Sequence, residues 1–247
     1  MNDADAQPVM TGGVVPDEYV TTYLGHGGCA PGVETFHLSR PGGYTFRPGQ
    51  FFQLTIETRD GEQSRYFSHA DAPDDPVTEF TTRLTGSAFK DALLALEPGA
   101  GVRFRGPMGR LGVPDGVTSV GFLTGGVGIT PAHSIIRDAM VRRTGLVVAL
   151  FYANREPSCI PYSAEFRAYA EADPRFRYVE VVEVPDADWT GPVGYLTADI
   201  IRARVDLAEP RHWIVSGPPP MVDAMRSVIR ALEVAPEHVS YEQFSSY

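Results

Sequence analysis

A run of ten residues, FLTGGVGITP at positions 122–131, is the part of this sequence best suited to bind a phosphate group. It begins as an apolar, β-branched segment and then breaks at three glycines, which allow several backbone N–H groups to crowd into one tight loop. The glycines are Gly125, Gly126 and Gly128. Thr130 and the proline after it suit the N-cap and first position of a helix whose positive end faces the loop. The run therefore predicts an anion site.

The spacing of this loop matches neither GxGxxG nor the P-loop, because no Lys-Ser or Lys-Thr pair follows it. An NTPase is therefore disfavoured. Two interpretations stay open at this point. The loop binds a dinucleotide, or it is a strand–turn–helix junction whose glycines serve packing alone.

Two more loops follow predicted strands, Tyr-Ala-Asn-Arg at 152–155 and Ser-Gly-Pro-Pro-Pro-Met at 216–221. Ligands of parallel sheets bind at the carboxyl ends of the strands. We expect the loop at 152–155 to meet an adenosine ribose and the loop at 216–221 to lie near the ring at the other end of the ligand. The alternative for the second loop is a rigid turn that opens a helix.

A second candidate site lies in the first half of the chain, at Arg-Tyr-Phe-Ser, positions 65–68. In a strand, Arg65 and Phe67 point to one face, while Tyr66 and Ser68 point to the other. Arg65 in a mostly buried strand needs an anionic partner, and the N-terminus of the helix predicted to begin at Ser87 offers a second anion site in the same domain. The alternative is that Arg65 pairs with a carboxylate of the protein itself.

The elements that position these residues differ between the two halves of the chain. The first half predicts a six-stranded antiparallel barrel or sandwich with one helix over 87–96, where Phe89, Leu93 and Leu96 recur at helical spacing. Its predicted strands cover residues 19–24, 33–38, 50–58, 65–69, 79–84 and 102–106. Residues 1–13 are small and polar, and we expect them to be disordered.

The second half alternates strands with helices, which predicts a parallel sheet covered on both faces. Its strands are predicted at 119–124, 146–152, 176–184, 212–216 and 238–241, and its helices at 131–143, 162–172, 197–204 and 219–232. A Gly- and Pro-rich connector places the boundary near Val113. The expected domains are therefore a barrel over 14–113 and an α/β nucleotide-binding domain over 114–247.

Seven motifs in this order resemble the ferredoxin:NADP reductase family. They are FRPGQF at 46–51, RYFS at 65–68, GSAF at 86–89, GPMG at 106–109, GGVGITP at 125–131, GPPPM at 217–221 and YEQF at 241–244. Each motif alone is weak, but their shared order and spacing are hard to obtain by accident. The resemblance covers residues 18–247.

The resemblance implies an FAD-binding barrel and an NAD(P)-binding domain, with hydride passing from nicotinamide to flavin between them. Arg65 matches the family arginine on the flavin pyrophosphate, and Ser68 matches the serine near flavin N5. Phe67 takes the place of the family's tyrosine against the isoalloxazine, and Glu242 resembles a carboxylate near the nicotinamide.

The implied FAD contacts are Arg65, Tyr66, Phe67, Ser68, His69, Gly86, Ser87, Ala88 and Phe89. The implied nicotinamide cofactor contacts are Gly125, Gly126, Gly128, Thr130, Arg155, Tyr162, Gly217, Pro218 and Met221. The residues nearest the reaction would be Ser68, Ser216 and Glu242, and a C-terminal aromatic, Phe244 or Tyr247, would stack on the flavin unless the tail is frayed.

Three departures from the family pattern matter. Phe67 lacks the hydroxyl that would reach the ribityl chain, although its aromatic contact survives. Ser216 replaces a common cysteine and so removes a polarizable thiol from beside the nicotinamide. His69 follows Ser68 where small or apolar residues are common; it could donate to the flavin pyrimidine, but we favour a histidine that faces solvent.

The choice of nicotinamide cofactor depends on the end of the strand at 146–152. An acidic residue there would bind a ribose 2′-hydroxyl, but Arg155 follows instead, and a guanidinium suits a 2′-phosphate. Tyr162 resembles the family's adenine-stacking tyrosine. Glu156 weakens the argument, so NADPH is only slightly favoured over NADH.

Composition narrows the possible partners. The formal net charge of −10 disfavours nucleic acid and anionic membranes, no apolar run is long enough to span a bilayer, and the N-terminus lacks a signal-peptide pattern, so we expect a cytoplasmic protein. Two cysteines cannot ligate an all-cysteine iron–sulfur cluster, and no metal site is expected.

Ferredoxin, flavodoxin or an oxygenase component are the expected electron acceptors, with a free flavin or a quinone as alternatives. Docking of an acidic carrier would need the only compact basic cluster, Arg137, Arg142 and Arg143. Two other classes stay open: a flavin-bearing electron-transfer subunit without independent turnover, and a nucleotide-binding sensor without flavin.

Overall fold

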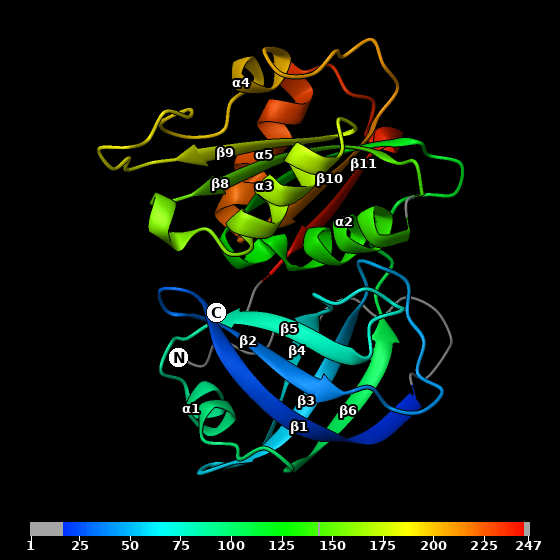
Figure 1. Ribbon diagram of the computed structural model, residues 1–247, viewed down its shortest axis with the longest axis vertical. Helices are drawn as coiled ribbons and strands as arrows, with labels where there is room; N and C mark the ends of the chain where they lie inside the picture. The colour runs from blue at the N-terminus through cyan, green and yellow to red at the C-terminus, as the bar shows by residue number, and fades with distance from the viewer. Residues whose placement is uncertain (1–16, 143, 245–247) are drawn as a thin grey trace.

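The computed structural model describes residues 17–142 and 144–244. The expectation of disorder for residues 1–13, and the possible role of Tyr247, lie outside these ranges. The described chain forms an antiparallel sheet and a parallel sheet, one above the other in Figure 1. Both sheets and their order in the sequence confirm the predicted fold class.

The antiparallel sheet has six strands in the order β4-β3-β6-β1-β2-β5. They are β1 (Asp17–Ala30), β2 (Val33–Ser39), β3 (Phe51–Thr58), β4 (Gly61–Ser68), β5 (Val77–Arg83) and β6 (Gly101–Met108). Strict alternation along β3 buries Phe52, Leu54 and Ile56 on its inner face. These side chains form part of the hydrophobic core of the barrel.

The sheet curls into a barrel that is open along one seam, because β4 and β5 are its two edge strands. Side chains close the seam instead of a hydrogen-bond ladder. The rings of Phe67 on β4 and Phe80 on β5 lie 4.4 Å apart, and Phe89 of helix α1 (Ala88–Leu94) lies 6.0 Å from Phe67. This arrangement places α1 and Arg65 beside the seam.

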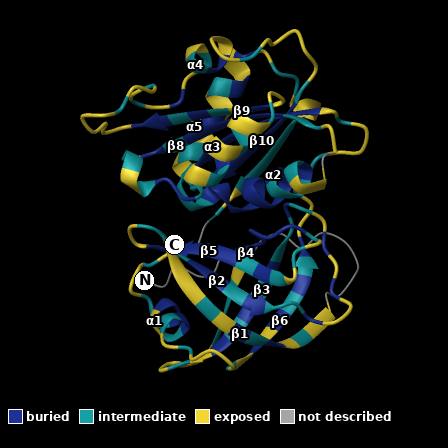
Figure 2. Ribbon diagram, viewed as in Figure 1, coloured by how far each residue is buried: buried dark blue, intermediate teal, exposed yellow. Residues whose placement is uncertain are grey.

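The parallel sheet has five strands in the order β11-β10-β7-β8-β9. They are β7 (Ser119–Gly125), β8 (Val147–Asn154), β9 (Phe176–Val182), β10 (His212–Gly217) and β11 (Val239–Gln243). Helices α2 (Thr130–Arg142) and α3 (Ser163–Ala172) pack on one face, and α4 (Ala198–Arg202) and α5 (Pro219–Ala231) pack on the other. Because both faces are covered, β7 and β10 are buried along their whole length, as Figure 2 shows for the centre of the sheet.

Helix α2 joins the two halves, since it lies between the parallel sheet and the barrel (Figure 1). His133 Nδ1 lies 2.7 Å from the carbonyl oxygen of Ala70, and the Ser134 hydroxyl donates to the carbonyl of Asp71 at 2.6 Å.

The predicted boundary near Val113 falls in the connector between β6 and β7. Within the described ranges, no helix is long and apolar enough to cross a membrane.

Candidate functional site at the carboxyl edge of the parallel sheet

The predicted phosphate loop continues directly into a helix. Strand β7 ends at Gly125, a 3₁₀ turn spans Gly126–Ile129, and α2 begins at Thr130 without a break. The prediction that Thr130 caps this helix is wrong. Its backbone is already helical (φ −53°, ψ −52°), and its hydroxyl donates to the carbonyl of Val127 at 2.7 Å. No side chain caps the turn at Gly125, so backbone N–H groups at this end are left for a ligand.

Two of the three glycines are required for packing between loops. A Cβ atom at Gly128 would lie 2.5 Å from the Cα of Gly217, and one at Gly125 would lie 2.5 Å from the sulfur of Met221. Gly126 has no such neighbour but has a φ of +53°, a conformation that favours glycine. The packing interpretation is therefore correct for Gly125 and Gly128, and it does not exclude the anion site, because it is this packing that brings the loops together.

A second helix begins beside the first. Helix α5 starts after Pro218, which provides no side-chain cap, and the Ser216 hydroxyl donates to the carbonyl of Gly128 at 2.8 Å. Ser216 was expected to line a nicotinamide pocket, but its side chain is fully buried and ties the two loops together. The result is two adjacent helix N-termini without side-chain caps, a favourable arrangement for a diphosphate.

The ends of β7, β10 and β11 also carry buried polar atoms without partners. Ser216 is in register with Thr124 on one side and Glu242 on the other. Thr124 Oγ1 and Glu242 Oε2 are buried and have no hydrogen-bond partner among the described residues. Burial raises the pKa of Glu242 to about 7, so near neutral pH part of the population carries a proton there. Sequence reasoning did not single out Thr124, because in the sequence it is only the last residue of an apolar strand.

The chain beyond β11 stays attached to this edge as far as the structure describes it. The N–H of Phe244 donates to the carbonyl of Gly217 at 3.1 Å. A frayed tail is therefore not observed at Phe244, whose backbone is held at the end of β10.

On the barrel side, Arg65 carries a charge without a counter-charge. Its guanidinium donates to the carbonyl of Ser64 at 2.8 Å and to the side chain of Gln63 at 3.3 Å, and it lies over the ring of Phe89. No ion pair of Arg65 occurs in the part of the chain that the structure describes. The alternative in which Arg65 pairs with a carboxylate of the protein is thus not found.

Helix α1 begins where the sequence predicts, directly after its N-cap Ser87. Gly86 has a φ of +68°, and the Ser87 side chain caps α1 by accepting from the N–H of Lys90 at 3.3 Å. Lys90 itself was missed by sequence reasoning, because it follows Phe89 on a short helix where a lysine usually faces water. Its side chain is instead buried and bonded to the Thr82 hydroxyl. Burial lowers the pKa of Lys90 to about 8, and the neighbouring Arg65 charge acts in the same direction.

The rings of β4 are placed differently from the expectation. Phe67 shares a side with Arg65, as alternation predicts, but it is only 8% exposed and packs into the barrel core. Tyr66 is the outward ring, 37% exposed, and its hydroxyl accepts from Gln53. Tyr66 rather than Phe67 is the ring of this strand that a ligand outside the sheet can reach. Ser68 is buried, and its hydroxyl has no partner among the described residues.

The expectation that His69 faces solvent is wrong, and neither of its ring nitrogens is left free for a flavin. Its ring is fully buried, with Nε2 2.8 Å from the Tyr44 hydroxyl and Nδ1 2.9 Å from Asp71. It also stacks on Phe46 at 3.7 Å. Both nitrogens are used inside the barrel, so His69 supports the strand end that carries Ser68.

Tyr162 also differs from its expected role as an open platform for adenine. Its ring stacks on His133 at 3.8 Å, and its hydroxyl bonds to Thr81 on β5. It therefore belongs to the contact between the two sheets. Arg155 does lie at the open edge, with its side chain 78% exposed and 3.6 Å from Glu156.

Arg83 is a further cation at this edge that sequence reasoning did not single out. It lies at the end of β5, and one of its terminal nitrogens is 3.9 Å from the point where a Cβ atom of Gly126 would lie. The end of β5 therefore reaches the phosphate loop, which joins the barrel site to the parallel-sheet site.

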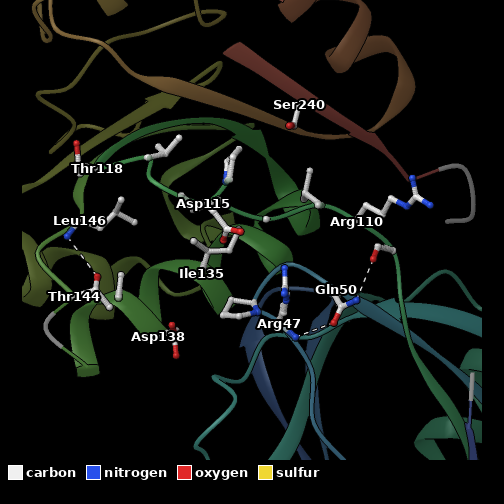
Figure 3. A pocket seen from close by; sticks show the side chains of 18 of the residues that line it. Arg47, Gln50, Arg110, Asp115, Thr118, Ile135, Asp138, Thr144, Leu146 and Ser240 are labelled. Atoms are coloured by element: carbon white, nitrogen blue, oxygen red, sulfur yellow. Dashed lines mark hydrogen bonds between the residues drawn. The ribbon is translucent and has the colours of Figure 1, made fainter. Parts of the chain in front are cut away.

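A cavity of about 830 Å³ lies elsewhere, between the connector, α2 and the FRPGQF motif (Figure 3). Its wall includes Thr118, Leu146 and Ser240, which lie at the amino ends of the parallel strands, away from the loops described above.

No group of three His, Cys, Asp or Glu side chains suited to a metal ion occurs within residues 17–142 and 144–244.

Comparison with known proteins agrees with this geometry. Residues 122–227 match the family model described as "Oxidoreductase NAD-binding domain". Ferredoxin–NADP reductase B of Sorangium cellulosum is 30% identical over 226 residues, which is 87% of this chain and 93% of that protein. NADH-cytochrome b5 reductase 1 of Ajellomyces capsulatus is 37% identical over 149 residues, 57% of this chain and 48% of that protein. The match thus spans only about half the length of the cytochrome b5 reductases.

Among solved structures, a ferredoxin–NADP⁺ reductase from Neisseria gonorrhoeae with bound FAD and NADP aligns with a TM-score of 0.79. The alignment covers 92% of this chain and 98% of that one at 20% sequence identity. At this level of identity the similarity establishes the fold.

Proposed function

Because the chain belongs to the ferredoxin–NADP reductase-like family of FAD- and NAD(P)-binding oxidoreductases, we propose that it is an NAD(P)H-dependent flavin oxidoreductase. Bound FAD would accept a hydride from the nicotinamide and pass electrons on to a redox protein or a small acceptor. One observation carries the proposal. Groups that could bind an anion or a polar ligand occur in both halves: Arg65, which has no counter-charge among the described residues, and the unpartnered Ser68 hydroxyl in the barrel, and two helix N-termini without side-chain caps in the parallel sheet.

In this proposal, the chain's residues bind and orient. Arg65 neutralises the flavin pyrophosphate, and the buried Ser68 hydroxyl gains a partner on the flavin ring. The loops after β7 and β10 hold the nicotinamide cofactor, while Glu242 places a partly protonated carboxyl beside Ser216. Chemistry then depends on alignment of the two cofactors within a site formed by both sheets.

The charges on α2 bear on which class of electron acceptor this chain uses. The cluster expected to dock an acidic carrier is largely neutralised. Arg137 pairs with Asp75 at 2.7 Å and with Glu165 at 3.3 Å, Arg142 lies 3.4 Å from Asp138, and Arg143 lies outside the described residues. We therefore favour an acceptor that does not depend on this patch, such as an oxygenase component, a free flavin or a quinone, over ferredoxin or flavodoxin.

A second candidate function is a flavin-bearing subunit that works only inside a complex. Val20 and Leu24 favour it, because they lie on the outer face of β1 with exposures of 77% and 44%. Steady turnover of the isolated chain with artificial dyes would exclude it. A colourless preparation would instead favour the sensor without flavin.

The proposed function is tested by the visible spectrum of the purified protein under anaerobic conditions. We expect flavin bands that bleach on addition of NADPH or NADH, and the donor that bleaches them faster is the preferred cofactor. A protein that takes up no FAD, or a bound flavin that neither donor reduces, would contradict the proposal.

Arg155 tests the preference between the two donors. If its exposed guanidinium binds the 2′-phosphate, Arg155→Ala should raise the KM for NADPH about tenfold and leave that for NADH nearly unchanged. Arg167→Ala is a suitable control, because Arg167 is also exposed but pairs with Glu180. An equal effect of Arg155→Ala on both donors would show that this arginine does not bind the 2′-phosphate.

A further inference from the structure

Lys90 is the only lysine among the 21 lysine and arginine residues of the chain, and it is buried. Its side chain is 7% exposed, whereas lysine is almost never fully buried unless it is paired. A carboxylate partner for its ammonium group does not occur among residues 17–142 and 144–244. The contacts of the amino group are the Thr82 hydroxyl and the face of the Phe67 ring, 5.2 Å from its centroid.

Lys90 and Arg65 form one interleaved cluster at the open seam of the barrel. Arg65 lies 5.4 Å from the ring centroid of Phe89, while Lys90 lies over Phe67, and these two rings are 6.0 Å apart. Two residues come from β4 and two from α1. The cluster thus places two cations beside each other, and neither has an anionic partner in the described chain.

Two neighbouring cations without a counter-charge destabilise each other. Arg65 is the charged side chain whose repulsion acts on Lys90, and desolvation adds a larger cost. An apolar side chain of similar length would fill the same space between Phe67 and Thr82 without either cost. The pair is therefore explained best by a ligand that carries at least two negative charges.

We infer that Lys90 acts with Arg65 as a paired cationic site for the phosphate groups of FAD. The inference rests on the proposed function and adds to it a residue that contributes charge. Helix α1 is only seven residues long, and Ser87 already satisfies its Lys90 N–H. The positive charge at this end of α1 therefore comes from the Lys90 side chain.

A single lysine makes the direct test simple, because protein grown with lysine labelled with ¹³C at Cε gives one lysine resonance. We expect Lys90 to titrate at least one pH unit higher in protein loaded with FAD than in protein loaded with riboflavin, which lacks phosphate. One unit means that FAD, compared with riboflavin, favours the protein with the charged amine over the protein with the neutral amine by a further factor of ten. Equal midpoints with FAD and riboflavin would overturn the inference.

Substitution provides the second measurement. Lys90→Met keeps the length and apolar stem of the side chain, and we expect it to raise the dissociation constant for FAD 10- to 30-fold, measured by flavin fluorescence. Lys90→Arg restores a charge and should stay within about threefold of the wild type. Circular dichroism of Lys90→Met checks that the barrel still folds, and the resonance of the wild-type protein gives an independent result if it does not.

The outcomes separate the two proposals. Wild-type protein that binds no FAD contradicts the proposed function and the inference together. Wild-type protein that binds FAD, alongside a folded Lys90→Met variant with unchanged affinity, contradicts only the role of Lys90.

Discussion

Replacing Arg65 with alanine is expected to raise the dissociation constant for FAD about 30- to 100-fold. The guanidinium has no carboxylate partner among the described residues, so its charge is available to the flavin pyrophosphate. Hydrogen bonds to charged groups contribute roughly 1.5–3 kcal/mol, and each 1.4 kcal/mol is a factor of ten in affinity. Equilibrium titration of the flavin-free protein with FAD, followed by fluorescence, measures the change.

Arg59→Ala is the matched control for this experiment. Arg59 lies in the turn before β4, its side chain is 74% exposed, and its neighbour is Asp60 at 3.8 Å. It should leave FAD affinity unchanged. If Arg65→Ala retained full flavin occupancy while remaining folded, the assignment of Arg65 to the pyrophosphate would be wrong.

Substitution of Gly128 with alanine is expected to have the largest effect on the loops of the parallel sheet. The added Cβ would lie 2.5 Å from the Cα of Gly217 and 2.7 Å from the carbonyl oxygen of Ser216. Because both contacts are with backbone, rotation of a side chain cannot relieve them, and the two loops must separate. Overpacking of this kind costs about 3 kcal/mol, which lowers the Tm by roughly 6–12 °C in a chain of this size.

The same change should slow flavin reduction by NADPH or NADH at least tenfold, since the two helix N-termini would no longer share one ligand. Gly42→Ala is the control, because a Cβ atom there has no neighbour within 4 Å. Stopped-flow absorbance measures reduction, and thermal unfolding measures stability. A Gly128→Ala variant with wild-type Tm and reduction rate would show that the close approach of these loops is not required.

The strands and helices were largely predictable because their signals are local. Alternation along β3 and the strand–helix rhythm after Ser119 depend on residues a few positions apart, and the observed sheets follow them. The convergence of the loops after β7, β8 and β10 also followed from the sequence, since these strands are parallel neighbours. The open seam between β4 and β5 did not, because strand order in a curled sheet depends on pairings distant in sequence.

The sequence by itself thus determined the two kinds of sheet, the edge where their loops gather and the candidate roles of Arg65 and Ser68. Only the tertiary structure decided which polar side chains already have partners. It places both nitrogens of His69 in the barrel and turns Tyr162 toward His133. It also leaves Lys90 and one carboxylate oxygen of Glu242 buried without an ion-pair partner among the described residues. The physical reason is that burial and hydrogen bonding of a polar group depend on neighbours from other elements, whereas periodicity depends on neighbours in the chain.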